Sequence, residues 1–263
     1  VTFLNDSEKA KIFDNKNKFD EVFSEFIARD FLDALNCSLE EATRFYNDNE
    51  VGFAKMLDLA CGKGAEVINM SDFADAKAFY DYIKEKGFGV VEEYLINHDA
   101  IREVYKPALN TMRMFTIIGD DNKPHLFFAA QKFGVNGRFI DVHGIHAPID
   151  LETGIIHFPF HSGNTDTDLI YTKHPDTGYD LTEYKVPMFK EAAEMILKAA
   201  MVVPEMRYVG WDVAITNKGP KIVEGNNYTA YDYMQLPDQN PSRIGVIPDL
   251  LKIVPSFKDE LYK

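Results

Sequence analysis

The chain has 263 residues, of which 46% are hydrophobic, with 20 Phe and 13 Tyr, a composition typical of a globular protein and not of a disordered one. Its formal net charge of −14 argues against a nucleic-acid binder, which would carry a basic face. The two cysteines imply no disulfide framework or zinc site, and no apolar run reaches transmembrane length, so we expect a protein without a membrane span in the reducing cytoplasm.

Residues 1–50 are predicted to be mainly helical. Their apolar side chains fall at helical spacing at Phe19, Val22, Phe23, Phe26, Phe31, Leu32 and Leu35. Ser38, followed by Glu40 and Glu41, is typical of the N-cap of a further helix.

A short strand is predicted at 51–57, with Lys55 inside it, and a second at 66–70. The loop between them contains Gly62, Lys63 and Gly64. Such a loop can close over phosphates, because glycine lets the backbone approach and the ammonium group neutralises charge. A plain hairpin turn is the alternative, since the pattern is not a Walker motif and does not lead into a helix.

A helix beginning at Ser71 is predicted to end at Gly87, and a strand at 90–96 runs into Asp99. This strand contains Glu92 and Glu93, although strands disfavour acids. The simplest interpretation is that the strand leaves the core for solvent.

Residues 110–118 predict a strong strand that contains Arg113, and 125–133 predict its partner. Asp141, His143 and His146 follow. A metal site is not expected from the H-x-x-H spacing, because residues three apart on a strand face opposite sides. His143 can share a face with Asp141, as a polar substrate contact or as a structural pair.

Residues 151–186 contain few periodic apolar positions and are predicted to form a long loop over a site, or a flap. A helix at 187–201 and a short helix near 246–253 are also predicted.

Between those helices, two apolar runs flank the turn sequence Asn217-Lys218-Gly219-Pro220 and predict a β-hairpin. Strand alternation places Glu224 and Asn226 on one face, and Asp212 can lie opposite them. Three oxygen ligands make a plausible Mg²⁺ site. The alternative is an ordinary solvent-facing acid pair. We favour the metal because the flanking residues are apolar, and a buried carboxylate needs a partner or a metal.

In chain order these features are a lysine on a strand, a Gly-rich loop, an acidic strand end, an arginine on a strand, an aspartate and a Glu-x-Asn sequence. This order resembles the ATP-grasp superfamily over roughly residues 15–235. The most similar group is the ATP-grasp proteins associated with sugar transfer and polysaccharide gene clusters. The phrases that carry this likeness are Asn110-Thr111-Met112-Arg113, Ala147-Pro148-Ile149-Asp150, Lys173-His174-Pro175-Asp176-Thr177-Gly178 and Arg207-Tyr208-Val209-Gly210-Trp211-Asp212.

The resemblance implies an α+β fold in which two subdomains grip ATP between antiparallel sheets. It implies four parts: an N-terminal helical segment at 1–50, an N-subdomain with the flap and hinge at 51–105, a C-subdomain with the metal-binding hairpin at 106–235, and a tail at 236–263. The acceptor site would be supplied by the helices of 1–50, the 151–186 loop or a partner chain.

The resemblance also implies roles for individual residues. ATP phosphates would be contacted by Lys55 and by the flap residues Gly62, Lys63 and Gly64. The adenine edge would be read by Glu92, Glu93, Tyr94 and Leu95, and the ribose by Asp99. Mg²⁺ would be held by Asp212, Glu224 and Asn226. Catalysis would involve Arg113, Lys63 and His143, with His143 and Asp141 toward the acceptor.

The implied activity is that of an Mg-ATP-dependent ligase, which activates a carboxylate as an acyl phosphate and joins it to an amine or similar nucleophile. The acceptor would be a small-molecule, sugar-linked or peptide compound, in polysaccharide or peptide modification. Two alternatives remain: an ATP-grasp kinase that phosphorylates a hydroxyl group, and a nucleotide-binding module without turnover.

Overall fold

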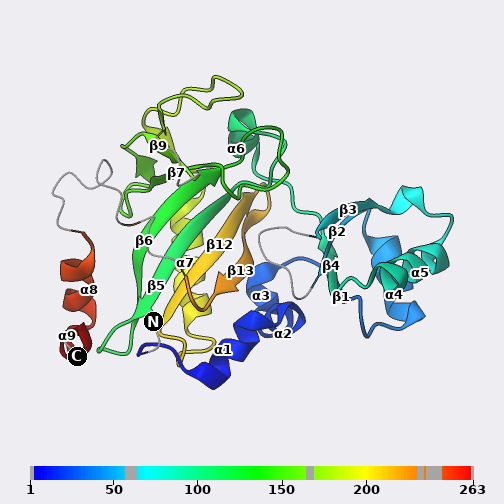
Figure 1. The fold of residues 1–263 in the computed structure, drawn as a ribbon, viewed down its shortest axis with the longest axis horizontal. Helices are drawn as coiled ribbons and strands as arrows, with labels where there is room; N and C mark the ends of the chain where they lie inside the picture. Colours follow the sequence, from blue (N-terminus) through cyan, green and yellow to red (C-terminus); the bar gives the residue numbers. More distant parts are fainter. Residues whose placement is uncertain (1–2, 57–63, 164–168, 230–233, 235–244, 262–263) are drawn as a thin grey trace. The chain divides into compact units, whose positions relative to one another are not determined.

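A computed structural model describes residues 3–56, 64–163, 169–229, 234 and 245–261. The chain forms two compact units, each with an antiparallel sheet and helices (Figure 1). Unit 2 contains residues 14–96, and unit 1 contains residues 1–13 and 97–263. The predicted α+β class is therefore confirmed, and the boundary after Ile96 lies immediately past the predicted hinge residues.

Unit 2 contains a four-stranded antiparallel sheet in the order β1-β4-β2-β3. The strands are β1 (Phe31–Asp33), β2 (Val51–Lys55), β3 (Glu66–Asn69) and β4 (Val90–Glu93). The helices are α2 (Lys16–Val22), α3 (Ser24–Ile27), α4 (Leu39–Asp48) and α5 (Ala76–Lys86), with a 3₁₀ turn η1 (Met70–Asp72). Phe45 of α4 and Phe79 of α5 pack with Ala54 and Val91 of the sheet in one apolar core.

The predicted N-cap at Ser38, at the start of α4 in unit 2, is confirmed. Ser38 Oγ accepts a hydrogen bond from Glu41 N (3.2 Å), and Glu41 Oε2 accepts one from Ser38 N (2.7 Å), which is a complete capping box. The end of α5 at Gly87, with φ of 71°, is also confirmed. Its start was predicted too early, because Ser71 lies in η1 and Asp75 caps the helix.

The helical prediction for 31–35 is wrong. Residues Phe31–Asp33 form β1, which pairs antiparallel with β4. The pairing of Leu32 with Val91 buries both side chains in the same core. A contact between positions so distant in sequence overrides the helical spacing of the local apolar residues.

Unit 1 contains a seven-stranded antiparallel sheet in the order β10-β9-β7-β6-β5-β12-β13. The strands are β5 (Thr111–Ile118), β6 (Pro124–Phe133), β7 (Ile145–Pro148), β9 (Phe160–Ser162), β10 (Ile170–Tyr171), β12 (Tyr208–Thr216) and β13 (Gly219–Asn226). Helix α7 (Phe189–Ala200) packs on β5, β6, β12 and β13 (Figure 1). The remaining elements are α1 (Ser7–Asp14), α6 (Asp99–Val104), the pair β8 (Ile155–Ile156) and β11 (Tyr184–Lys185), α8 (Ile247–Ile253), η4 (Pro255–Phe257) and α9 (Lys258–Leu261).

The prediction of a long loop at 151–186 is wrong for part of that segment. Strands β9 and β10 extend the large sheet, and β8 pairs with β11. His174 is buried, stacks on Tyr105 with ring centroids 4.8 Å apart, and its Nε2 lies 2.8 Å from Gly134 O. Strands of two or three residues are too short to show a periodic pattern, so this segment offered no local signal.

Successive side chains along β5 and β12 point to opposite faces of the large sheet. Met114 and Trp211 are cross-strand partners on an apolar, fully buried face. Arg113 and Asp212 are partners on the opposite face. Across the described residues, no helix is both long and apolar enough to cross a membrane.

Candidate functional site

An acidic pair lies on the predicted hairpin, which the structure confirms as β12 and β13. Asp212 and Glu224 are direct cross-strand partners, and Asn226 pairs with Gly210. Asp212 is only 5% exposed, whereas Glu224 is exposed. The register therefore places the two carboxylates side by side, with Asn226 one alternation step further along β13.

Two cations bind the buried carboxylate. Arg113 Nε lies 3.0 Å from Asp212 Oδ1, and Lys132 Nζ at the end of β6 lies 2.9 Å from the same oxygen. Lys132 Nζ also lies 3.3 Å from Asp141 Oδ1. We call Arg113, Lys132, Asp141, Asp212 and Glu224 the carboxylate–cation cluster.

Hydrogen bonds with Thr111 and Thr229 hold this cluster in place. Asp141 Oδ2 accepts hydrogen bonds from the backbone N–H and the hydroxyl of Thr111, both at 2.7 Å. Arg113 Nη1 donates to Thr229 Oγ1 at 3.2 Å. Gly210 allows this approach, because a Cβ atom there would clash with the Thr229 side chain.

The electrostatics of the cluster favour an ionised Asp212. Burial alone would raise the pKa of this carboxyl group, but Arg113, Lys132 and a hydrogen bond with Glu224 lower it to about 2. The two cations also account for the burial of Asp212, so burial by itself is not an argument for a metal.

The donor set nevertheless fits Mg²⁺. Two carboxylates and an amide oxygen match an ion that binds one or two protein carboxylates together with phosphate oxygens and water. Asn226 Nδ2 donates to Gly210 O at 3.3 Å, which orients its amide on the strand. Among the described residues there is no group of three His, Cys, Asp or Glu side chains that could hold a metal, so a site here would depend on Asn226 and on substrate oxygens.

Sequence reasoning missed Lys132 as a member of this site. The signal was available, because Lys132 interrupts the apolar run Phe127-Phe128-Ala129-Ala130 and Phe133 in the same way that Arg113 interrupts its own strand. Asp141 was expected to share a face with His143, but Asp141 is buried and bonds Thr111 and Lys132, whereas His143 is exposed and lines a pocket. His143 lies on a loop with φ of 58°, so strand alternation does not apply there.

In unit 2, Lys55 and Glu92 are bonded to each other. Lys55 Nζ lies 2.6 Å from Glu92 Oε2, and Arg29 Nη2 lies 2.9 Å from Glu92 Oε1. The backbone N–H groups of Glu93 and Tyr94 donate to Asp30 O and Val51 O. Glu92 thus has a structural role as an ion-pair partner of Lys55, which the sequence did not predict.

Three further residues that were predicted to contact the nucleotide are Asp99, Leu95 and Gly64. Asp99 begins α6 with an exposed carboxylate, and its backbone N–H donates to Asn217 Oδ1 at 3.1 Å, which anchors it beside the β12–β13 turn. Leu95 is buried. Gly64 adopts a positive φ of 68° after β2, whereas Gly62 and Lys63 lie outside the described residues.

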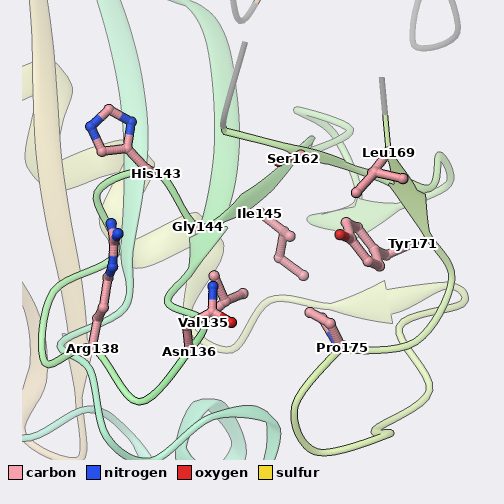
Figure 2. Close-up of a pocket in the computed structure, with 10 residues that line it drawn as sticks. All are labelled: Val135, Asn136, Arg138, His143, Gly144, Ile145, Ser162, Leu169, Tyr171 and Pro175. Carbon is pink, nitrogen blue, oxygen red and sulfur yellow. The ribbon is translucent and has the colours of Figure 1, made fainter. Parts of the chain in front are cut away.

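His143 lines a pocket of about 450 Å³ in unit 1 (Figure 2). Arg138 and His143 lie on one side, and Leu169, Tyr171 and Pro175 on the other. Arg138 Nη1 donates to Val142 O at 3.3 Å. The remaining lining residues are Val135, Asn136, Gly144, Ile145 and Ser162.

The fold is similar to those of solved ATP-grasp enzymes. The biotin carboxylase domain of 2-oxoglutarate carboxylase from Hydrogenobacter thermophilus, in complex with MgADP and bicarbonate, matches 86% of this chain and 42% of its own with a TM-score of 0.52 and 12% identity. N5-carboxyaminoimidazole synthetase from Staphylococcus aureus, complexed with ADP, matches 84% of this chain and 46% of its own with a TM-score of 0.50 and 12% identity.

A third solved structure is the ATP-grasp ligase PsnB, complexed with a phosphomimetic variant of its minimal precursor, Mg and ADP. It matches 87% of this chain and 54% of its own, with a TM-score of 0.49 and 12% identity. The chain thus spans about half the length of these structures. At this identity the likeness supports the fold alone.

A search of curated proteins found no match. The sequence matches the family described as sugar-transfer associated ATP-grasp over residues 67–244, which is more than half of the chain. The matched range includes β4, Arg113, Lys132 and the β12–β13 hairpin. The predicted resemblance is therefore confirmed, and the chain belongs to the sugar-transfer associated ATP-grasp family.

Proposed function

We propose that this protein is an Mg-ATP-dependent ligase that joins a carboxylate to an amine. The observation that carries the proposal is the carboxylate–cation cluster, in which an acidic pair and two cations share one face of the sheet. Phosphoryl transfer depends mainly on positioning and on neutralisation of charge, which these groups can supply. Family membership supports the same reading.

The reaction has two steps. A carboxylate oxygen attacks the γ-phosphorus of ATP, the bond from that phosphorus to the β,γ-bridging oxygen breaks, and ADP leaves. The amine nitrogen then attacks the carbonyl carbon of the acyl phosphate and loses a proton, while the bond from carbon to the phosphate oxygen breaks and inorganic phosphate leaves.

The residues of this face have two proposed roles, metal binding and neutralisation of phosphate charge. Asp212, Glu224 and Asn226 would hold Mg²⁺, which, when bound, neutralises phosphate charge. Arg113 and Lys132, on the same face of the sheet, would neutralise the charge of the transferred phosphoryl group. In the free protein the same cations keep Asp212 ionised and ready to coordinate.

Most of the residues proposed to bind the nucleotide belong to unit 2, and Asp99 belongs to unit 1. Lys55 would contact the phosphates of the nucleotide, and Gly62, Lys63 and Gly64 are proposed as further phosphate contacts. The segment that contains Glu93, Tyr94 and Leu95 would read the adenine and Asp99 the ribose, whereas Lys55 and Arg29 occupy both carboxylate oxygens of Glu92. We also propose that the chain divides by role into an N-terminal helical segment at 1–50, an N-subdomain at 51–105, a C-subdomain at 106–235 and a tail at 236–263.

Lys55→Ala should weaken ATP binding by about 10- to 100-fold, because a charge-assisted contact with phosphate is lost. Titration calorimetry with a non-hydrolysable ATP analogue and Mg²⁺ measures this change. Lys77→Ala is the matched control, since Lys77 is an exposed lysine of unit 2 paired with Asp81. Equal affinities for Lys55→Ala and the unaltered protein would remove Lys55 from the nucleotide site.

The acceptor is proposed to bind in the pocket of Figure 2. Among the described residues that line it are Arg138 and His143 but no acid, in a chain that carries a net charge of −14, so an anionic group is favoured. Leu169, Tyr171 and Pro175 offer an apolar wall for a ring. The pocket loop also carries Asp141, which bonds Lys132 of the cluster. We therefore propose a carboxylate-bearing ring compound, such as a sugar acid.

Arg138→Ala should raise the KM for the acceptor by about 10- to 100-fold and leave nucleotide affinity unchanged. The assay uses a panel of uronic acids, amino acids and short peptides, with ATP, Mg²⁺ and hydroxylamine as the amine. Lys190→Ala, an exposed cation on α7, is the control. An unchanged KM in Arg138→Ala would exclude the pocket as the acceptor site.

The same assay separates the alternatives. A ligase releases phosphate and forms a hydroxamate only when a carboxylate is present. A kinase forms ADP and retains the phosphate on a hydroxyl group. ATP binding without turnover for any acceptor would indicate a non-catalytic module.

A further inference from the structure

A buried arginine and aspartate from the N-terminal part of unit 2 meet the predicted hinge strand. Asp20 lies on α2 and Arg29 follows α3, and their side chains are 2% and 0% exposed. Sequence comparison with the family covers residues 67–244 and so does not include either residue.

These residues form a chain of contacts that ends at Lys55. Arg29 Nη2 lies 3.4 Å from Asp20 Oδ1 and 2.9 Å from Glu92 Oε1. The other oxygen of Glu92, Oε2, lies 2.6 Å from Lys55 Nζ. Lys55 is the most exposed of the four side chains, at 16%. We call Asp20, Arg29, Glu92 and Lys55 the buried network.

We propose that Arg29 and Asp20 are positioning residues for the nucleotide-binding Lys55, acting through Glu92, and that protonation of Asp20 strengthens phosphate binding at Lys55. This inference rests on the proposed nucleotide-binding role of Lys55.

The location of the exchangeable proton follows from the environment of each carboxyl group. Burial, and then the charge of Glu92, raise the pKa of Asp20 to about 7, although Arg29 and Lys55 oppose the shift. Burial would also raise the pKa of Glu92, but Arg29 and Lys55 lower it to about 2. The proton therefore resides on Asp20, and Glu92 remains a carboxylate.

The charge of the network changes with that proton. With Asp20 neutral, two cations face the single carboxylate of Glu92, so one positive charge remains for a phosphate. With Asp20 ionised, the charges of the four groups cancel. Glu93, the other acid that acts on Arg29, reduces the positive potential in both states.

Linkage gives the sign of the effect. A phosphate bound at Lys55 favours neutral Asp20, so binding takes up a proton, and affinity falls as the pH rises through about 7. Arg29 matters in either state, because without it Glu92 would depend on Lys55 alone and would hold that lysine away from phosphate.

The test compares the unaltered protein with Asp20→Asn, which fixes a neutral side chain at nearly the same volume. ATP-analogue affinity is measured with Mg²⁺ from pH 6.0 to 8.5. Because the nucleotide titrates equally in both experiments, only the difference between the proteins is informative. We expect the unaltered protein to lose about 3- to 10-fold more affinity over this range than Asp20→Asn. Asp81→Asn, an exposed acid of unit 2, should follow the unaltered protein.

A second variant separates positioning from folding. Arg29→Lys keeps the charge and should retain most of the affinity, with the pH dependence of the unaltered protein. Parallel pH curves for Asp20→Asn and the unaltered protein, with nucleotide binding intact, would overturn the inference and leave the proposed function standing. Failure of the unaltered protein to bind nucleotide at any pH would overturn both.

Discussion

We expect Glu224→Gln to lower magnesium-dependent ATP turnover by about 10²- to 10³-fold, while thermal stability stays nearly unchanged. Glu224 is exposed on β13, so removing its charge leaves no buried group uncompensated. Its partner across the hairpin is Asp212, and the pair provides the carboxylates of the proposed metal site. Turnover is measured as ADP formation across a titration of MgCl₂, in which a weakened site needs more metal.

Asp212→Asn should lose turnover to a similar degree but should also destabilise unit 1. Without the carboxylate, Arg113 and Lys132 remain as largely buried cations without their shared partner. Glu224→Gln is therefore the cleaner test of the chemistry. Glu191→Gln on α7 is the matched control. If Glu224→Gln and Asp212→Asn both turned over ATP at a near-normal rate, the metal assignment would be wrong.

Arg29→Met should destabilise unit 2 by about 3–5 kcal/mol, because Glu92 and Asp20 would remain buried without their shared cation. Arg44→Met, at an exposed ion pair with Asp30, should cost less than about 1 kcal/mol. Because the chain has two compact units, the effect has to be measured for each unit separately.

Two probes distinguish the units. Trp211 is the single tryptophan and lies in unit 1, so its fluorescence reports the unfolding of that unit. Amide hydrogen exchange of β2 and β4 reports unit 2. The expected result for Arg29→Met is faster exchange in β2 and β4 with little change in the Trp211 transition. Unchanged exchange in those strands would show that the arginine contributes little to the core of unit 2.

Several local features were predictable because a few neighbouring residues encode them. Alternation on both sides of a turn sequence defined the β12–β13 hairpin, and with it the pairing of Asp212 and Glu224. The capping box at Ser38 and the left-handed Gly87 depend on contacts within one helical turn. Arg113 could be identified as unusual because a charge inside an apolar strand requires a partner.

The partners themselves were not predictable. Lys132 reaches Asp212 only because the strand order places β6 next to β5, and β5 next to β12, and Asp141 joins the cluster through Lys132. Arg29 reaches Glu92 because β1 pairs with β4, in a segment whose apolar spacing predicted a helix. Short strands such as β9 and β10 depend on the neighbours that complete their hydrogen bonds.

The sequence by itself thus determined the hairpin, the capping box of α4, the end of α5 and the ordered set of charged residues that resembles the ATP-grasp superfamily. Only the tertiary structure decided which charges neutralise one another. The physical reason is that alternation and capping act over a few residues, whereas an ion pair requires two side chains to meet in space. The burial of Asp212 suggested a metal, whereas the structure shows a carboxylate held ionised by two cations.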